Sequence, residues 1–210
     1  MNPNPKLNGV AKKENRQCQH SLKKRLFTVK EYHQMFELGI LSKSDHVELI
    51  EGEIIQMPAT GIAQARCLQQ LIAIFGQLPE TTASLDFKNQ VQLNKQTEIK
   101  PDMVLLRFRA DSCEITYIEV SEVLLLIGIT ECGVDNNLDI KIPIYVRSLI
   151  PEVWLLNLVE NSLEVYRQPT PNGYNLILKL HRGQEIAPIG FPDFTVSVDA
   201  ILPTINKSIV

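Results

Sequence analysis

The sequence predicts one domain of the α/β (α+β) class, a mixed β-sheet flanked by helices, and three observations support this prediction. The chain has 210 residues, enough for one sizeable domain and short for two. Its hydrophobic content of 44% and charged content of 21% are ordinary for a globular protein. Segments with helical spacing of apolar residues alternate with short strand-like runs, as expected for helices packed on a sheet.

The first elements predicted are a helix, a hairpin and a second helix. Thr28 suits the N-cap position because Glu31 follows three residues later, the spacing of a capping box, and this helix is expected to end near residue 37. Residues 47–57 contain a Glu-Gly pair between two apolar runs, which predicts two short strands around a turn. Apolar residues at helical spacing predict an amphipathic helix over 61–76.

The middle of the chain is predicted to be rich in strands. Residues 91–93 alternate in polarity, and residues 103–106 form a compact apolar run shortly after Pro101. The run 123–129 is apolar apart from Gly128. A continuous apolar run of this length indicates a central strand that is buried on both faces.

The last third is predicted to hold one helix and several strands. Apolar residues step by four, three and four over 139–149, so a helix is expected there. Pro143 should lie in or near its first turns, where a missing N–H costs least. Further strands are expected at 153–158, 163–166, 175–180 and 194–198, the first two joined by a turn at 160–161.

Basic groups are concentrated at the N-terminus. Residues 1–26 carry seven Lys and Arg against the single acid Glu14, which leaves 14 basic and 23 acidic groups in the remainder, a net charge of −9. We therefore expect 1–26 to be a basic, disordered tail and 27–205 to form the domain. A basic arm suits phosphate contacts, although a solvated leader is the plainer interpretation, and the acidic body argues against a broad DNA groove.

The apolar runs and the cysteines also indicate the cellular compartment of the protein. No apolar run approaches the roughly 18 residues needed to span a bilayer, and the first residues do not resemble a signal peptide. We therefore expect a cytoplasmic protein without membrane attachment. The cysteines form no CxxC pair, which favours reduced thiols over a disulfide framework or a zinc site. They are Cys18, Cys67, Cys113 and Cys132.

Three polar residues are candidates for chemistry on phosphodiesters. Mg²⁺ binds carboxylate oxygens, and a nuclease also needs a positive charge near the scissile phosphate. Asp102, Lys141 and Glu48 meet these demands. Each also has a plainer interpretation: Asp102 as the start of a strand, Lys141 as a surface lysine whose stem packs on apolar groups, and Glu48 as ordinary hairpin polarity.

Five segments in a characteristic order carry a resemblance to a known family. They are FTVKEY at 27–32, VELIEGEIIQM at 47–57, KPD at 100–102, DIKIPIY at 139–145 and IPEVWL at 150–155. Together they resemble the putative restriction endonuclease family abundant in cyanobacteria, a branch of the PD-(D/E)XK nuclease superfamily. The resemblance covers about residues 26–203. It implies a restriction-endonuclease-like core, Mg²⁺ as cofactor and DNA as partner.

The resemblance also implies roles for single residues. Glu48 matches the glutamate between helix and hairpin, Asp102 the first metal-binding aspartate, and Lys141 the catalytic lysine. That lysine usually lies thirteen residues after the second metal-binding glutamate, and in this chain that position holds Gly128. Gln64 and Asn137 are two further departures, at positions where the family often has histidine and aspartate.

Other acids are candidates to replace the missing carboxylate. Strand alternation places Thr130 on the face of Gly128, without a charge, and Glu131 on the other face. Glu119 lies 22 residues before the lysine. Asp135 and Asp139 are near the lysine in sequence and would reach a metal only through an inward-folded loop.

These observations leave three functions open. The first is a Mg²⁺-dependent DNA endonuclease, expected to be impaired because of Gly128. The alternatives are a non-catalytic nucleic-acid-binding protein on the same fold, and a protein-interaction module that uses an exposed sheet edge. By analogy with the superfamily, a homodimer is also an open expectation.

Overall fold

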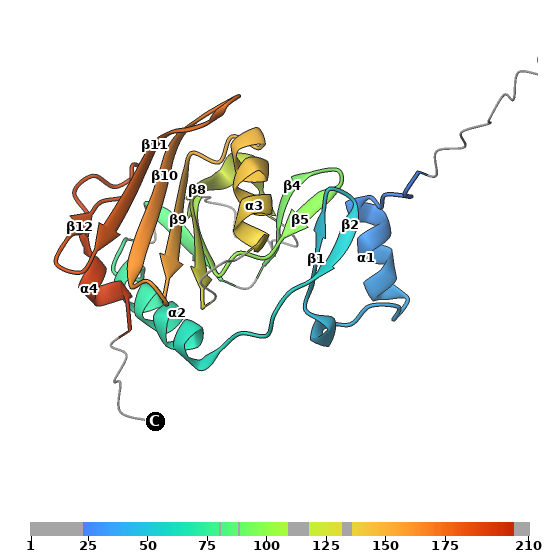
Figure 1. Cartoon of the computed structure of the whole chain (residues 1–210), viewed down its shortest axis with the longest axis horizontal. Helices are drawn as coiled ribbons and strands as arrows, with labels where there is room; N and C mark the ends of the chain where they lie inside the picture. The colour runs from blue at the N-terminus through green and yellow to red at the C-terminus, as the bar shows by residue number, and fades with distance from the viewer. Residues whose placement is uncertain (1–22, 80, 88, 109–117, 132–135, 204–210) are drawn as a thin grey trace, which may run out of the picture.

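A six-stranded sheet forms the larger half of the molecule (Figure 1). The computed structural model describes residues 23–79, 81–87, 89–108, 118–131 and 136–203, without the side chains of 136–139. The strand order is β11-β10-β9-β8-β6-β3. The strands are β3 (Ala83–Asp86), β6 (Met103–Arg107), β8 (Val123–Thr130), β9 (Glu152–Asn157), β10 (Ser162–Thr170) and β11 (Gly173–His181).

The sheet is antiparallel except at its centre, where β8 and β9 run parallel. Parallel neighbours need a crossover connection, and here helix α3 (Asn136–Arg147) supplies it. Strand β8 is buried over most of its length, because helices or a second sheet cover both of its faces. This confirms the central strand predicted at 123–129.

A second sheet of five short strands stands beside α3. Its order is β2-β1-β5-β4-β7, and β4 and β7 are parallel while the other neighbours are antiparallel. The strands are β1 (Val47–Ile50), β2 (Glu53–Gln56), β4 (Val91–Asn94), β5 (Thr97–Ile99) and β7 (Ile118–Glu119). A small pair, β12 (Glu185–Ile186) and β13 (Val196–Ser197), completes the strands of the described residues.

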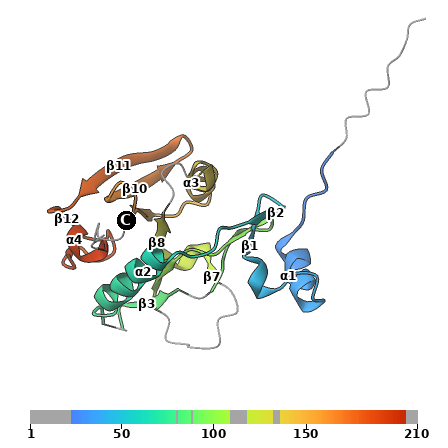
Figure 2. The same ribbon diagram turned by 60° about the horizontal axis from the view of Figure 1, so that its bottom comes forward.

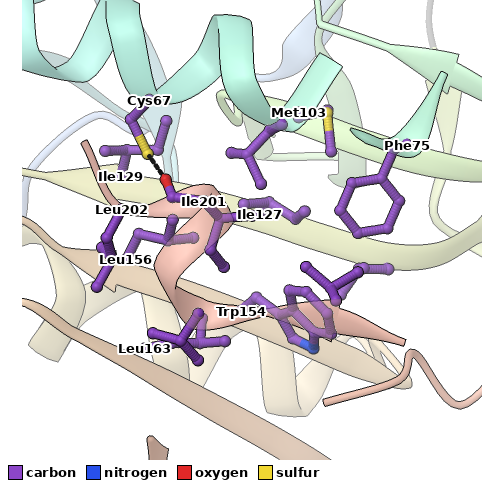
Figure 3. Close-up of a cluster of buried hydrophobic side chains, with 14 of the residues drawn as sticks. Cys67, Phe75, Met103, Ile127, Ile129, Trp154, Leu156, Leu163, Ile201 and Leu202 are labelled. Atoms are coloured by element: carbon purple, nitrogen blue, oxygen red, sulfur yellow. Dashed lines mark hydrogen bonds between the residues drawn. The ribbon is translucent and has the colours of Figure 1, made fainter. Parts of the chain in front are cut away.

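Three apolar clusters hold these layers together. The first lies between the six-stranded sheet and helices α2 (Ile62–Phe75) and α4 (Val198–Ile201), where Phe75 and Trp154 meet edge to face (Figure 3). In this cluster the thiol of Cys67 donates to the carbonyl of Ile201 at 3.0 Å. A second cluster packs α3 and the five-stranded sheet against the opposite face of β8 and β6.

The third cluster places helix α1 (Val29–Glu37) at the far end of the molecule (Figure 2). Val29 and Tyr32 are buried against Leu49 of β1, and the Tyr32 hydroxyl donates to the Val47 carbonyl at 2.8 Å. The capping box predicted at Thr28 and Glu31 is present.

The chain before α1 already contacts the domain. Lys24 forms an ion pair with Glu53 at 2.8 Å, and the Phe27 N–H donates to the Gly52 carbonyl at 2.8 Å. Gly52 has a φ of +81°, and a Cβ at this position would lie 2.6 Å from the Cβ of Leu26. A side chain at residue 52 would therefore be strained by its backbone conformation and would collide with this segment.

Most predicted elements are confirmed, and two predictions are wrong. Helix α3 begins at Asn136 rather than residue 139, so Pro143 lies inside the helix and not in its first turns. Of the strand predicted at 194–198, only β13 forms, because Val198 begins α4. The prediction also missed four short strands that carry no long alternating pattern, β3, β5, β7 and β12.

None of the helices in the described part of the chain is long and apolar enough to cross a membrane.

Candidate active site at the start of β6

Asp102 lies directly before β6, beside the end of β8. The register pairs Met103 with Ile127 and Val104 with Leu126, so one further step places Asp102 opposite Gly128. Side chains alternate along a strand, and Val104 and Leu126 belong to the cluster on the α3 face. Positions 102 and 128 therefore point to that same face, toward α3.

Both carboxylate oxygens of Asp102 accept hydrogen bonds. The side-chain amide of Gln64 donates to Oδ1 at 2.7 Å, and the backbone N–H of Ile129 donates to Oδ2 at 2.7 Å. Burial raises the pKa of Asp102 above its ordinary value, and the charge of Glu48 acts in the same direction. The two hydrogen bonds and the charge of Lys141 oppose this rise without cancelling it.

Gly128 leaves a small space next to Asp102. A Cβ at this position would meet Cδ2 of Leu155 at 3.0 Å. That atom is the end of a flexible side chain, so a Cβ at position 128 requires Leu155 to shift by a few tenths of an ångström. A side chain introduced here would stand beside Asp102.

Glu48 and Lys141 form a buried ion pair on the same face. Lys141 on α3 places Nζ 2.7 Å from Oε2 of Glu48 on β1, and the backbone N–H of Lys100 donates to Oε1 at 3.1 Å. Among the described residues Oε2 of Glu48 has no well-aligned hydrogen bond, and its short contact with Lys141 is an ion pair. The exposed fractions of the two side chains are 4% for Glu48 and 14% for Lys141.

The three residues predicted from the sequence thus share one site. Glu48 pairs with Lys141, and it also accepts a hydrogen bond from the backbone of Lys100, two residues before Asp102. Tyr145 lies one turn after Lys141 on α3, and its side chain is buried in the second apolar cluster. Burial, followed by the charges of Glu48 and Asp102, raises the pKa of its hydroxyl well above the ordinary value.

The candidate replacement acids lie elsewhere. The carboxylate of Glu131 turns toward the start of α2, where it accepts a hydrogen bond from the backbone N–H of Gln64 at 2.6 Å. Glu119 lies on β7, in the five-stranded sheet rather than beside β6. Asp135 lies outside the described residues, as does the side chain of Asp139.

Gln64 is the contact that sequence reasoning missed. The resemblance singled it out as a departure, but nothing local to α2 connects it with Asp102, which is 38 residues away.

The residues present do not fit the Mg²⁺ site that the resemblance implies. In the described part of the chain no three His, Cys, Asp or Glu side chains cluster so that they could hold a metal ion. Each oxygen of Asp102 faces a donor, and one oxygen of Glu48 faces the ammonium of Lys141. Mg²⁺ requires an octahedron of oxygen ligands, and this donor set offers it positive hydrogens instead.

The fold defines a class of protein. A crystal structure described as a putative nuclease belonging to DUF820 from Anabaena variabilis superposes with a TM-score of 0.64 at 18% sequence identity. The superposition covers 83% of this chain and 97% of that one. This chain is therefore a single-domain α+β protein with the fold of that nuclease-like structure.

The family follows from the sequence match. Residues 29–199 match the Uma2 family, described as "Putative restriction endonuclease", and the chain belongs to this family. The resemblance noted from the sequence is thereby confirmed. Proteins of this restriction-endonuclease-like family generally use a divalent metal. The comparison with curated proteins finds no match.

Proposed function

We propose that this chain is a DNA endonuclease of the PD-(D/E)XK type whose Mg²⁺-dependent hydrolysis is impaired. The observation that carries the proposal is the position of Gly128 opposite Asp102, on the face that Lys141 and Glu48 share. A carboxylate at residue 128 would complete a pair of acids beside a lysine, and glycine supplies neither charge nor ligand.

In this proposal Asp102, Lys141 and Glu48 keep their roles, but they do not form a complete metal site. Asp102 stays as the single acid of the pair. Lys141 carries the positive charge that a scissile phosphate requires, and Glu48 holds its ammonium group at 2.7 Å. Loss of one carboxylate lowers both the negative charge and the number of ligands, so divalent metal is expected to bind weakly or not at all.

A plasmid-nicking assay tests the proposal. The wild type, Asp102→Ala and Gly128→Glu are incubated with supercoiled plasmid and Mg²⁺ or Mn²⁺. We expect the wild type and Asp102→Ala to be indistinguishable, and Gly128→Glu to gain metal-dependent nicking because it places a second carboxylate opposite Asp102. Adding Asp102→Ala to Gly128→Glu should abolish that gain. Nicking by the wild type that disappears in Asp102→Ala would overturn the proposal.

A second candidate function is DNA binding without cleavage through the basic N-terminus. Of the seven basic residues in 1–26, Lys24 is paired with Glu53 and Arg25 with Glu31. These two pairs reduce the positive charge that the segment offers to a phosphate backbone.

A further inference from the structure

Gln64 connects three parts of the candidate site. It is the third residue of α2, and its backbone N–H is held by the carboxylate of Glu131 at 2.6 Å. Its side-chain amide reaches across to Oδ1 of Asp102 at 2.7 Å. Gly61 makes this arrangement possible, since a Cβ there would lie 2.1 Å from Oε2 of Glu131. The Gln64 backbone is therefore anchored, and its side chain is directed at Asp102.

We infer that the Gln64 amide takes the place of a divalent cation at Asp102, and so weakens metal binding in addition to the loss of a carboxylate at Gly128. The inference rests on the proposed function, because it assigns a second cause to the same loss. An amide N–H₂ group presents only positive hydrogens to a carboxylate. A cation bound at Oδ1 would have to approach these hydrogens closely, and the N–H of Ile129 already occupies the other oxygen at 2.7 Å.

The chemistry of one isosteric substitution follows from this contact. Gln64→Glu exchanges the amide nitrogen for an oxygen and leaves the length and shape of the side chain unchanged. Two carboxylates would then face each other where the donor and acceptor now stand 2.7 Å apart. Such a pair is stable only if it shares a proton or binds a cation between its oxygens. Gln64→Glu should therefore create affinity for a divalent metal.

Mn²⁺ titration followed by electron paramagnetic resonance tests the inference on the full-length chain without any assay of activity. The proteins are the wild type, Gln64→Glu, and the control Gln69→Glu, which makes the same change at an exposed position of the same helix. We expect Gln64→Glu to bind Mn²⁺ at least about tenfold more tightly than the other two. Adding Asp102→Asn should return its affinity to the wild-type value.

A second comparison tests the inference even if Gln64→Glu folds poorly. Gln64→Met keeps the chain length and removes the donor, so Gly128→Glu with Gln64→Met should bind Mn²⁺ about tenfold more tightly than Gly128→Glu alone. Equal affinities in these two proteins, or no gain in a folded Gln64→Glu, would overturn the inference and leave the proposed function standing. Tight, Asp102-dependent Mn²⁺ binding by the wild type would overturn both.

Discussion

The ion pair between Glu48 and Lys141 is buried, so removing one partner is expected to lower the free energy of unfolding. Both side chains are largely removed from water, so neither ion is well solvated without the other. Breaking such a pair leaves an uncompensated charge inside the protein, whereas replacing both partners removes the problem.

Lys141→Met is therefore expected to lower the free energy of unfolding by about 3–5 kcal/mol. The double substitution Glu48→Gln with Lys141→Met should recover most of that loss, because no buried charge remains. Urea unfolding of the three proteins measures both effects. A loss below about 1 kcal/mol in Lys141→Met would show that the pair is solvated in solution.

The capping box of α1 gives a second prediction for single residues, in its dependence on pH. A hydrogen bond from Arg25, followed by those from the backbone and side chain of Thr28, lowers the pKa of Glu31 from 4.5 to about 2. A lowered pKa of an acid means that the ionised form is favoured in the folded state. The contribution of Glu31 to stability is thus complete above pH 4.5 and is lost as the pH falls toward about 2.

We expect Glu31→Gln to remove this part of the pH dependence of unfolding. The titration of the Glu31 side-chain carboxyl carbon, followed by NMR between pH 1.5 and 6, measures its pKa directly. A midpoint near 4.5 would contradict the prediction, since it would mean that Arg25 and Thr28 do not favour the ionised form.

At the scale of the element, helix α2 begins without a side-chain cap of its own. Its N-cap residue is Gly61, which has no side chain to accept a hydrogen bond, and Glu131 from the end of β8 supplies the acceptor. A carboxylate at a helix N-terminus also interacts favourably with the helix dipole. This contact joins α2 to β8 across the sheet.

Gly61→Ala is expected to destabilise the protein by about 0.5–1 kcal/mol, because the new Cβ displaces the carboxylate of Glu131. Glu131→Ala should cost a similar amount. If both act through the same hydrogen bond, the double substitution costs no more than either one alone. Chemical denaturation of the four proteins gives this cycle, and additive losses would contradict it.

The elements also show where prediction from sequence succeeds and fails. Capping residues and apolar spacing are local signals, so α1, α2 and β8 were predicted almost to their ends. Pro143 was misplaced because α3 begins before its apolar pattern does, at Asn136. The short strand β5 was missed because all three of its residues, Thr97, Glu98 and Ile99, are buried by tertiary contacts rather than marked by alternation.

At the scale of the whole molecule, charge is distributed unevenly between the N-terminus and the acidic domain. Residues 1–22 contain four basic groups, Lys6, Lys12, Lys13 and Arg16. If these groups contact DNA phosphates, each contact adds about 0.9 to the slope of log affinity against log salt concentration.

Deletion of residues 1–22 is therefore expected to lower the magnitude of this slope by up to about 3.6. Fluorescence anisotropy with a labelled duplex at several salt concentrations measures it. A matched control replaces the four basic residues with glutamine at constant length. An unchanged slope in both proteins would exclude the N-terminal segment from DNA binding.

The sequence by itself determined the class of fold, most of the elements, and the positions 48, 102, 128 and 141 as candidates for one site. Periodicity and capping are local signals that predict elements, and the resemblance to a known family implied the site positions. Only the tertiary structure decided that Gln64 donates to Asp102 and that Glu131 holds the start of α2. Gln64 is 38 residues from Asp102 and 67 residues from Glu131. No local sequence pattern predicts which of such distant elements face each other in the packed fold.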